Sequence, residues 1–210
     1  MNTITYDNLY HGLPIMANQE QGWGCKIDIL NRLYQFLISM TNKHNKTLFI
    51  RFDLRFPQES NPPVDNCLLS GFLDSFKTSL SRDGLDPHYF WVREQSREKH
   101  QHYHLILLLN GSKVQSYYHI LQRAEYFWGL ALDCEAKGLV DFCNHSRDGS
   151  PQPNGLMLRR GTPDFVPAFR TCFHWGSYLA KERTKGYGPA WSKEFGSSRI
   201  RSSDNEHKFQ

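Results

Sequence analysis

Apolar and charged side chains alternate over most of the stretch Thr47-Leu-Phe-Ile-Arg-Phe-Asp-Leu-Arg-Phe56. Its even positions from 48 to 56 are all apolar, whereas Arg51, Asp53 and Arg55 occupy odd positions. Successive side chains of a β-strand point to opposite faces of the sheet. The stretch therefore predicts a strand with one buried side and one charged side.

The segments around this strand alternate between helical and extended patterns. Apolar residues at helical spacing predict helices over 26–43 and 114–134, and another that ends near Asp83-Gly84. Strands are predicted over 87–95 and 100–110, with a short one over 155–160. From residue 47 onward the order is β-α-β-β-α-β, which is typical of a ferredoxin-like α+β fold. In that fold an antiparallel sheet carries its helices on one face, so the other face is free for polar groups.

The composition is that of a soluble globular protein, with 39% hydrophobic and 22% charged residues. No apolar run reaches the length of a membrane span, and the N-terminal residues do not resemble a signal peptide. The five scattered cysteines predict reduced thiols and a cytoplasmic location. Between residues 145 and 201, ten Lys or Arg residues stand against four acidic ones. This excess favours a polyanionic partner, although a solvated basic surface explains the same charges.

The length of 210 residues suits one domain with extensions. We expect an irregular N-terminal arm over 1–24, one folded domain over 25–200 and a polar C-terminal tail over 201–210.

Two histidines in the strand expected at 100–110 form a candidate metal site. His102 and His104 are two residues apart, so their imidazoles point to the same face. Neutral imidazole is a common ligand of divalent metals. If a short turn joins this strand to the preceding one, Glu94 lies opposite His102 and its carboxylate converges with both imidazoles. The same pattern also fits surface histidines and a solvated carboxylate.

A further helix is expected from Pro167 to about Thr184, ending before Gly186. Its apolar residues cluster on one face, and Tyr178 and Lys181 lie on the opposite face. A tyrosine in a helix is usually a packing residue, but this one lies about half a turn from the apolar stripe. Taken alone, an exposed tyrosine with a lysine three residues later is more often a surface pair than a catalytic one.

Together, His102-Tyr-His104 in an apolar strand and Tyr178-Leu-Ala-Lys181 on a later helix resemble the two hallmark motifs of the HUH endonucleases. That superfamily includes the replication initiators of rolling-circle phages, plasmids and small DNA viruses. More narrowly, the stretch from Tyr178 to Lys185, with Phe195-Gly-Ser-Ser-Arg199, resembles the inovirus-type replication proteins of filamentous phages and prophages. The resemblance covers about residues 45–200.

The resemblance implies the HUH/Rep nuclease fold, here with an N-terminal helix and a C-terminal tyrosine helix added to the ferredoxin-like core. Three positions depart from the family pattern. Tyr103 stands between the histidines where relatives carry a smaller apolar residue, and Arg51 and Asp53 stand where many carry hydroxyl residues. No second tyrosine lies one helical turn from Tyr178, so the chain looks like a single-tyrosine member.

The activity implied by this resemblance is site-specific nicking and joining of single-stranded or hairpin origin DNA. Such an enzyme forms a 5′-phosphotyrosyl intermediate and initiates rolling-circle replication of a phage, prophage or related element in a bacterial host cell. The nucleophile would be Tyr178, assisted by Lys181. The ligands of a Mg²⁺ or Mn²⁺ ion would be His102, His104 and Glu94. A host replication helicase or polymerase is implied as a further partner.

Basic side chains in and near these motifs are candidates for contacts with DNA phosphates: Arg51, Arg55, Arg159, Arg160, Arg183 and Lys185. Trp175 or Trp191 could stack on unpaired bases, although packing explains either residue equally well. The sequence also leaves open whether His100 or Asp53 contributes to the metal site.

Two other classes of function remain open at this stage. A non-catalytic module that binds single-stranded nucleic acid could have the same fold, and it would use exposed aromatic residues such as Tyr89, Trp91 and Tyr103. A metal-dependent phosphodiester hydrolase that uses water as its nucleophile would need the histidines but not Tyr178.

Overall fold

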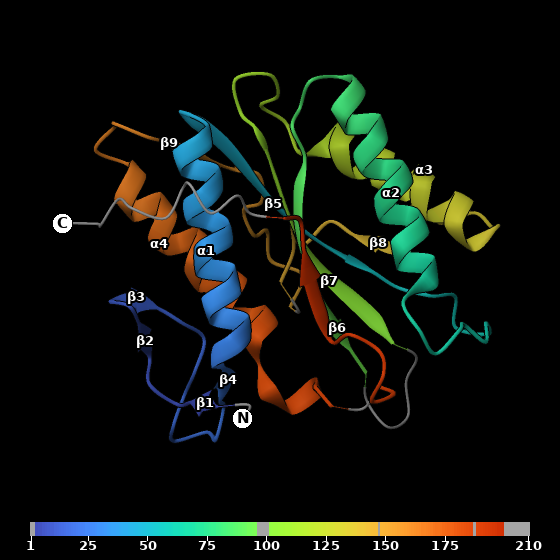
Figure 1. Cartoon of the computed structure of the whole chain (residues 1–210), viewed down its shortest axis with the longest axis horizontal. Helices are drawn as coiled ribbons and strands as arrows, with labels where there is room; N and C mark the ends of the chain where they lie inside the picture. Colours follow the sequence, from blue (N-terminus) through green and yellow to red (C-terminus); the bar gives the residue numbers. More distant parts are fainter. Residues whose placement is uncertain (1–2, 96–100, 147, 187, 200–210) are drawn as a thin grey trace.

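The computed structural model describes residues 3–95, 101–146, 148–186 and 188–199. An antiparallel sheet forms the middle layer (Figure 1), with the order β10-β6-β7-β5-β8 and with β9 also paired to β5. Its strands are β5 (Lys46–Leu54), β6 (His88–Glu94), β7 (His102–Asn110), β8 (Val140–Asp141), β9 (Leu156–Arg159) and β10 (Phe195–Ser197). The α+β class and the antiparallel sheet expected from the sequence are thus confirmed.

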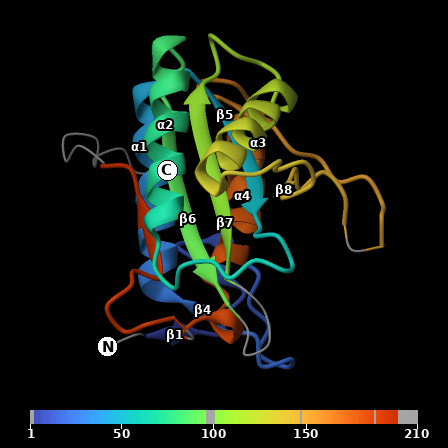
Figure 2. The same ribbon diagram turned by 90° about the vertical axis from the view of Figure 1, so that its right-hand side faces the viewer.

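Four helices cover both faces of this sheet: α1 (Ile27–Lys43), α2 (Cys67–Arg82), α3 (Tyr118–Leu132) and α4 (Phe165–Ser177). The helices α2 and α3 lie on one face, in front of the strands in Figure 2, and pack on the even-numbered apolar side chains of β5. On the other face, α1 and α4 pack on Phe49, Ile106 and Leu108. The expectation that this second face is free is therefore wrong for one half of it.

The second face is apolar at one end of the strands and polar at the other. Phe49 of β5 is fully buried there, whereas Arg51 and Asp53, further along the same strand, are only half-buried. The apolar half exists because α1 and α4 each present an apolar stripe to it, and Gly176 lets them approach closely. A Cβ atom added to Gly176 would lie 2.9 Å from Cδ2 of Leu33. The polar half is left for the side chains of the candidate site.

The helix α4 ends earlier than the helix expected over 167–184. At Ser177 the chain tightens into two 3₁₀ turns, η1 (Tyr178–Ala180) and η2 (Glu182–Thr184). The Ser177 hydroxyl donates to the carbonyl of His174 at 2.6 Å and accepts from the backbone N–H of Met16 at 2.8 Å. Side-chain bonds of this kind compete with helix propagation. The expectation that Tyr178 lies within a regular helix is wrong, because it begins the first 3₁₀ turn.

The N-terminal residues form a small unit of their own beside the end of α4. Three two-residue strands, β1 (Ile4–Thr5), β2 (Leu9–Tyr10) and β3 (Leu13–Pro14), precede β4 (Cys25–Lys26), and the pairs are β1 with β4 and β2 with β3. Strands this short leave no periodic signal in the sequence, which is also why β8 and β10 were not expected. Across the described ranges, no helix is both long and apolar enough to cross a membrane.

Candidate active site

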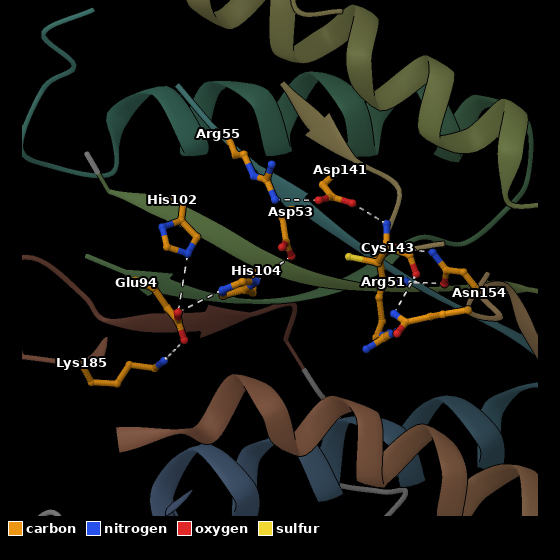
Figure 3. Close-up of polar contacts among 11 residues, drawn as sticks. Arg51, Asp53, Arg55, Glu94, His102, His104, Asp141, Cys143, Asn154 and Lys185 are labelled. Atoms are coloured by element: carbon orange, nitrogen blue, oxygen red, sulfur yellow. Dashed lines mark hydrogen bonds and ion pairs between the residues drawn. The ribbon is translucent and has the colours of Figure 1, made fainter. Parts of the chain in front are cut away.

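The polar half of the second sheet face gathers charged side chains from three adjacent strands (Figure 3). Glu94 of β6 is the register partner of His102 of β7, and Asp53 of β5 is the partner of His104. Directly opposed residues of antiparallel strands point to the same face. The position of Glu94 opposite His102, expected from the sequence, is thus where the structure places it, and Asp53 joins the group from the other side.

The three residues Glu94, His102 and His104 form a candidate metal centre. One ligand atom from each lies within 4.8 Å of the others. Oε2 of Glu94 lies 3.6 Å from Nε2 of His102 and 3.1 Å from Nε2 of His104. Burial by itself would raise the pKa of Glu94, but the two imidazoles and the Lys185 ammonium hold it well below its usual range. The carboxylate is therefore held in its charged form.

The nitrogen Nε2 of His104 is buried and has no hydrogen-bond partner, since its approach to Glu94 lacks hydrogen-bond geometry. The other nitrogen, Nδ1, lies 2.6 Å from Oδ1 of Asp53. Burial by itself would lower the pKa of His104, but Asp53, and then Glu94, raise it to about 9. A buried nitrogen without a partner is unusual. A divalent ion there would replace the proton on Nε2 of His104 and take that nitrogen as a ligand, so the donor set of two imidazoles and one carboxylate fits such an ion.

Lys185 lies behind Glu94, on the side away from the histidines. Its Nζ atom is 2.6 Å from Oε1 of Glu94, and the lysine side chain is fully buried. Burial lowers the pKa of Lys185, and the charge of Glu94 offsets only part of that effect. Because the side chain is turned towards the candidate metal ligands and not towards the surface, we place it with the site instead of with the DNA contacts.

Tyr178 and Lys181 lie next to the histidines. The ring of Tyr178 packs edge-on against the ring of His104, with 5.3 Å between their centroids, and Nζ of Lys181 lies 3.9 Å from the centroid of the Tyr178 ring. The 3₁₀ turn positions both residues, since its tighter winding brings the lysine over the tyrosine three residues earlier. The structure thus brings together His102, His104, Glu94, Tyr178 and Lys181.

The candidate DNA-binding arginines are spread more widely. Arg55 is exposed and pairs with Asp141 at 2.6 Å, and Arg183 is also exposed. Arg51 is half-buried, with its guanidinium carbon 4.7 Å from the centroid of the Trp175 ring.

The remaining two arginines lie at the far end of the sheet. Arg159 is the register partner of Lys46 at the start of β5, and Arg160 bonds to the carbonyl of Asn42 at 2.8 Å. Since Asp53 is seven residues further along β5 than Lys46, Arg159 is roughly 20 Å from the candidate metal centre along the strand. These two arginines are therefore not part of the same cluster.

Some residues weighed from the sequence fall elsewhere. His100 lies outside the described residues, as does the expected tail over 201–210. Tyr103 points to the opposite face, where its hydroxyl lies 3.1 Å from Oδ1 of Asn66. The motif accepts a large residue at this position because the side chain packs under α2 and α3 and not in the site. Trp191 is 71% exposed.

The fold and the site define an antiparallel α+β protein that carries a carboxylate and two imidazoles on one face of its sheet. The chain belongs to the YagK/YfjJ C-terminal domain family, whose profile matches residues 5–198. The uncharacterized protein YfjJ of Escherichia coli (strain K12) is similar, with 26% identity over 205 residues, covering 80% of this chain and 92% of YfjJ.

Among solved structures, the catalytic domain of the Adeno Associated Virus type 5 Rep protein is similar over 55% of this chain and 76% of that chain. The TM-score is 0.33 and the sequence identity is 11%. At this level the likeness does not decide function, which must be argued from the site.

Proposed function

We propose that this protein is a divalent-metal-dependent enzyme that nicks and rejoins single-stranded DNA, with Tyr178 as its nucleophile. One observation carries the proposal: the ring of Tyr178 lies against His104, which belongs to the cluster of Glu94, His102 and His104. A tyrosine nucleophile beside a group that can hold a divalent ion is one arrangement that can carry out phosphodiester transesterification.

The proposed ion is Mg²⁺ or Mn²⁺, held by Glu94, His102 and His104. When bound, it would draw charge from a non-bridging phosphate oxygen and orient the phosphate. Asp53 would orient His104 through Nδ1, and Lys185 would hold the Glu94 carboxylate in place from behind. Partners of this kind fix the direction of metal ligands and raise their basicity.

The covalent step belongs to Tyr178. Its phenolic oxygen attacks the phosphorus, and a new O–P bond forms while the bond from phosphorus to the 3′ oxygen breaks. The tyrosine loses a proton, and the leaving oxygen gains one to become a free 3′-hydroxyl. A free phenol has a pKa of about 10, so the nearby Lys181 ammonium would favour the phenolate by its charge. The phosphotyrosyl ester keeps much of the energy of the original bond, so attack by the 3′-hydroxyl rejoins the strand.

The resemblance of the motifs suggests a biological setting for this chemistry. We propose that the protein initiates rolling-circle replication of a phage, prophage or related element from a single-stranded or hairpin origin. The setting would be the cytoplasm of a bacterial host, where a replication helicase would unwind the duplex or a polymerase would extend the freed 3′ end. Arg55 and Arg183 are the exposed basic residues that we propose for backbone contacts near the site.

The rival classes make different use of the same fold. A module that binds unpaired bases on its sheet needs exposed aromatics, but Trp91 and Tyr103 are buried under α2 and α3, and Tyr89 is half-buried against the same core. That burial favours an enzyme over a binding module.

Mixing the protein with labelled single-stranded DNA and Mn²⁺ separates all three classes on a denaturing gel. The proposed enzyme gives a covalent protein–DNA adduct. A water-using hydrolase cuts the DNA without an adduct, and a binding module does neither, and either of these two results would overturn the proposal.

A further inference from the structure

The described part of the N-terminal arm (residues 3–24), together with β4, is tied by backbone contacts to the segment that contains Tyr178. The N–H of Glu182 donates to the carbonyl of Gly24 at 3.1 Å, and Cys25 forms an isolated β-bridge with Lys181. Together with the hydrogen bond from the N–H of Met16 to the hydroxyl of Ser177, these contacts hold the arm against residues that precede and follow Tyr178 in the sequence. Figures 1 and 2 both place β1 and β4 beside the chain that follows α4.

This docking brings one large aromatic side chain of the arm to the candidate site. Nζ of Lys181 lies 5.5 Å from the centroid of the Trp23 ring and 3.9 Å from that of Tyr178. The lysine thus lies close to both aromatic rings. Trp23 is nevertheless 38% exposed, and a two-way backbone bridge with Asn18 fixes its position. Trp23 therefore presents part of its indole to solvent next to the candidate site.

The packing of the arm depends on the residue next to Trp23. A Cβ atom added to Gly24 would lie 2.5 Å from Cγ2 of Ile4 and 3.1 Å from a ring carbon of Tyr6. The chain therefore passes close to the first residues of the arm. The backbone that carries the indole is held there by this approach at Gly24 and by the hydrogen bonds between Trp23 and Asn18.

We propose that Trp23 is a base-stacking residue, which holds one unpaired base of single-stranded DNA next to Tyr178. An indole offers a flat face to any base, and stacking of this kind is tolerant of sequence. Lys181, which lies over one face of the ring, would supply positive charge to the adjoining phosphate while the base stacks on the other face. A duplex cannot present an unstacked base, so Trp23 also selects single strands. The inference takes its ligand from the proposed function, but it concerns binding and not the covalent step.

The test measures DNA binding by fluorescence anisotropy in the Tyr178→Phe protein, with chelator present, so that no cleavage occurs. The probes are a labelled oligothymidylate and an oligomer of abasic nucleotides of the same length, which keeps the phosphates and lacks the bases. Trp23→Ala is expected to weaken binding of the oligothymidylate about tenfold and to leave binding of the abasic oligomer unchanged. Trp23→Tyr should restore most of the loss.

The matched control is Tyr126→Ala, because Tyr126 is 63% exposed and lies on α3, on the other face of the sheet. It should change neither affinity. Equal weakening of both probes by Trp23→Ala would mean that Trp23 only supports the fold of the arm, and no weakening of either would mean that no base stacks there. Either result overturns the inference. So does a Tyr178→Phe protein with Trp23 intact that binds both probes equally or binds neither.

The result is separable from the proposed function. If Trp23→Ala weakens binding of the oligothymidylate alone, but the wild-type protein forms no covalent adduct, the stacking role holds and the proposed nuclease activity does not. If the adduct forms, but Trp23→Ala does not weaken binding of the oligothymidylate selectively, the nuclease activity holds and the stacking role does not.

Discussion

Asp53 and His104 face each other across β5 and β7, with Oδ1 of the carboxylate 2.6 Å from Nδ1 of the imidazole. A carboxylate oxygen can only accept here, so Nδ1 carries the proton and Nε2 is left for the site. The arrangement of carboxylate, imidazole and ion recurs in metal centres. Asp53 thus acts on the candidate site through His104.

Asp53→Ala should lower the affinity for Mn²⁺ by about 10- to 100-fold, because His104 loses the group that fixes its ring. Isothermal titration calorimetry with Mn²⁺ measures this directly. The control is Asp83→Ala, which removes an exposed carboxylate paired with Arg123. An unchanged Mn²⁺ affinity in Asp53→Ala would show that the carboxylate has no part in the centre.

Removal of the metal, or of either histidine, should stop nicking while leaving most of the DNA affinity. His102→Ala and His104→Ala each take away a ligand, whereas affinity comes mainly from Lys and Arg contacts with phosphates. Glu94→Ala should raise the Mn²⁺ concentration needed for half-maximal nicking. A nicking assay with and without chelator, beside a binding assay, checks these outcomes. Full cleavage in chelator would remove the metal from the mechanism.

Lys185→Met should destabilise the metal-free protein by about 3–5 kcal/mol, because it takes the lysine charge away from the buried Glu94. Thermal unfolding should show a fall of about 10 °C in Tm. Mn²⁺ should restore more stability to this variant than it adds to the wild type, since the ion supplies positive charge to the same carboxylate.

The matched control for this prediction is Lys43→Met, whose ion pair with Asp86 is partly exposed. It should cost no more than about 1 kcal/mol. If Lys185→Met unfolds at the wild-type temperature, or if Mn²⁺ stabilises both proteins equally, Lys185 does not support Glu94.

Much of the sheet and part of the site could be predicted from the sequence. The alternation in 47–56 gives β5 its two faces, and a spacing of two puts His102 and His104 side by side wherever the strand lies. The partnership of Glu94 and His102 required only that a short turn joins two strands. These are local consequences of a period of two, and local patterns are what a sequence shows most directly.

The rest depends on contacts between distant residues. Lys185 reaches Glu94, 91 residues earlier, only after two 3₁₀ turns redirect the chain. The sequence predicts this lysine only as a candidate contact with DNA phosphates. The docking of the arm brings Trp23 to the site, and no spacing of residues in the sequence predicts that docking. A signal for Asp53 was present, since an acidic residue in a strand next to a His-x-His strand is a candidate partner for an imidazole.

Asn154→Ala should destabilise the fold by about 2–3 kcal/mol, because it leaves buried backbone groups without partners. β5 pairs with β9 over Lys46–Phe49 and with β8 at Asp53 and Leu54, so Arg51 lies between the two. The Asn154 amide fills this gap: it accepts from the N–H of Arg51 at 3.0 Å and donates to its carbonyl at 2.7 Å. Urea unfolding measures the loss, and wild-type stability in the variant would show that these bonds do not matter.

The most direct test of the account is peptide mapping of the covalent adduct formed with labelled single-stranded DNA and Mn²⁺. The Tyr178 ring lies against His104 and beside Lys181, so the nucleotide should be found on the peptide that contains Tyr178. Tyr178→Phe removes only the hydroxyl, so it should abolish the adduct while preserving folding and DNA binding. A nucleotide mapped to Tyr187 or to any other residue, or adduct formed at the normal rate by Tyr178→Phe, would contradict the assignment of the nucleophile.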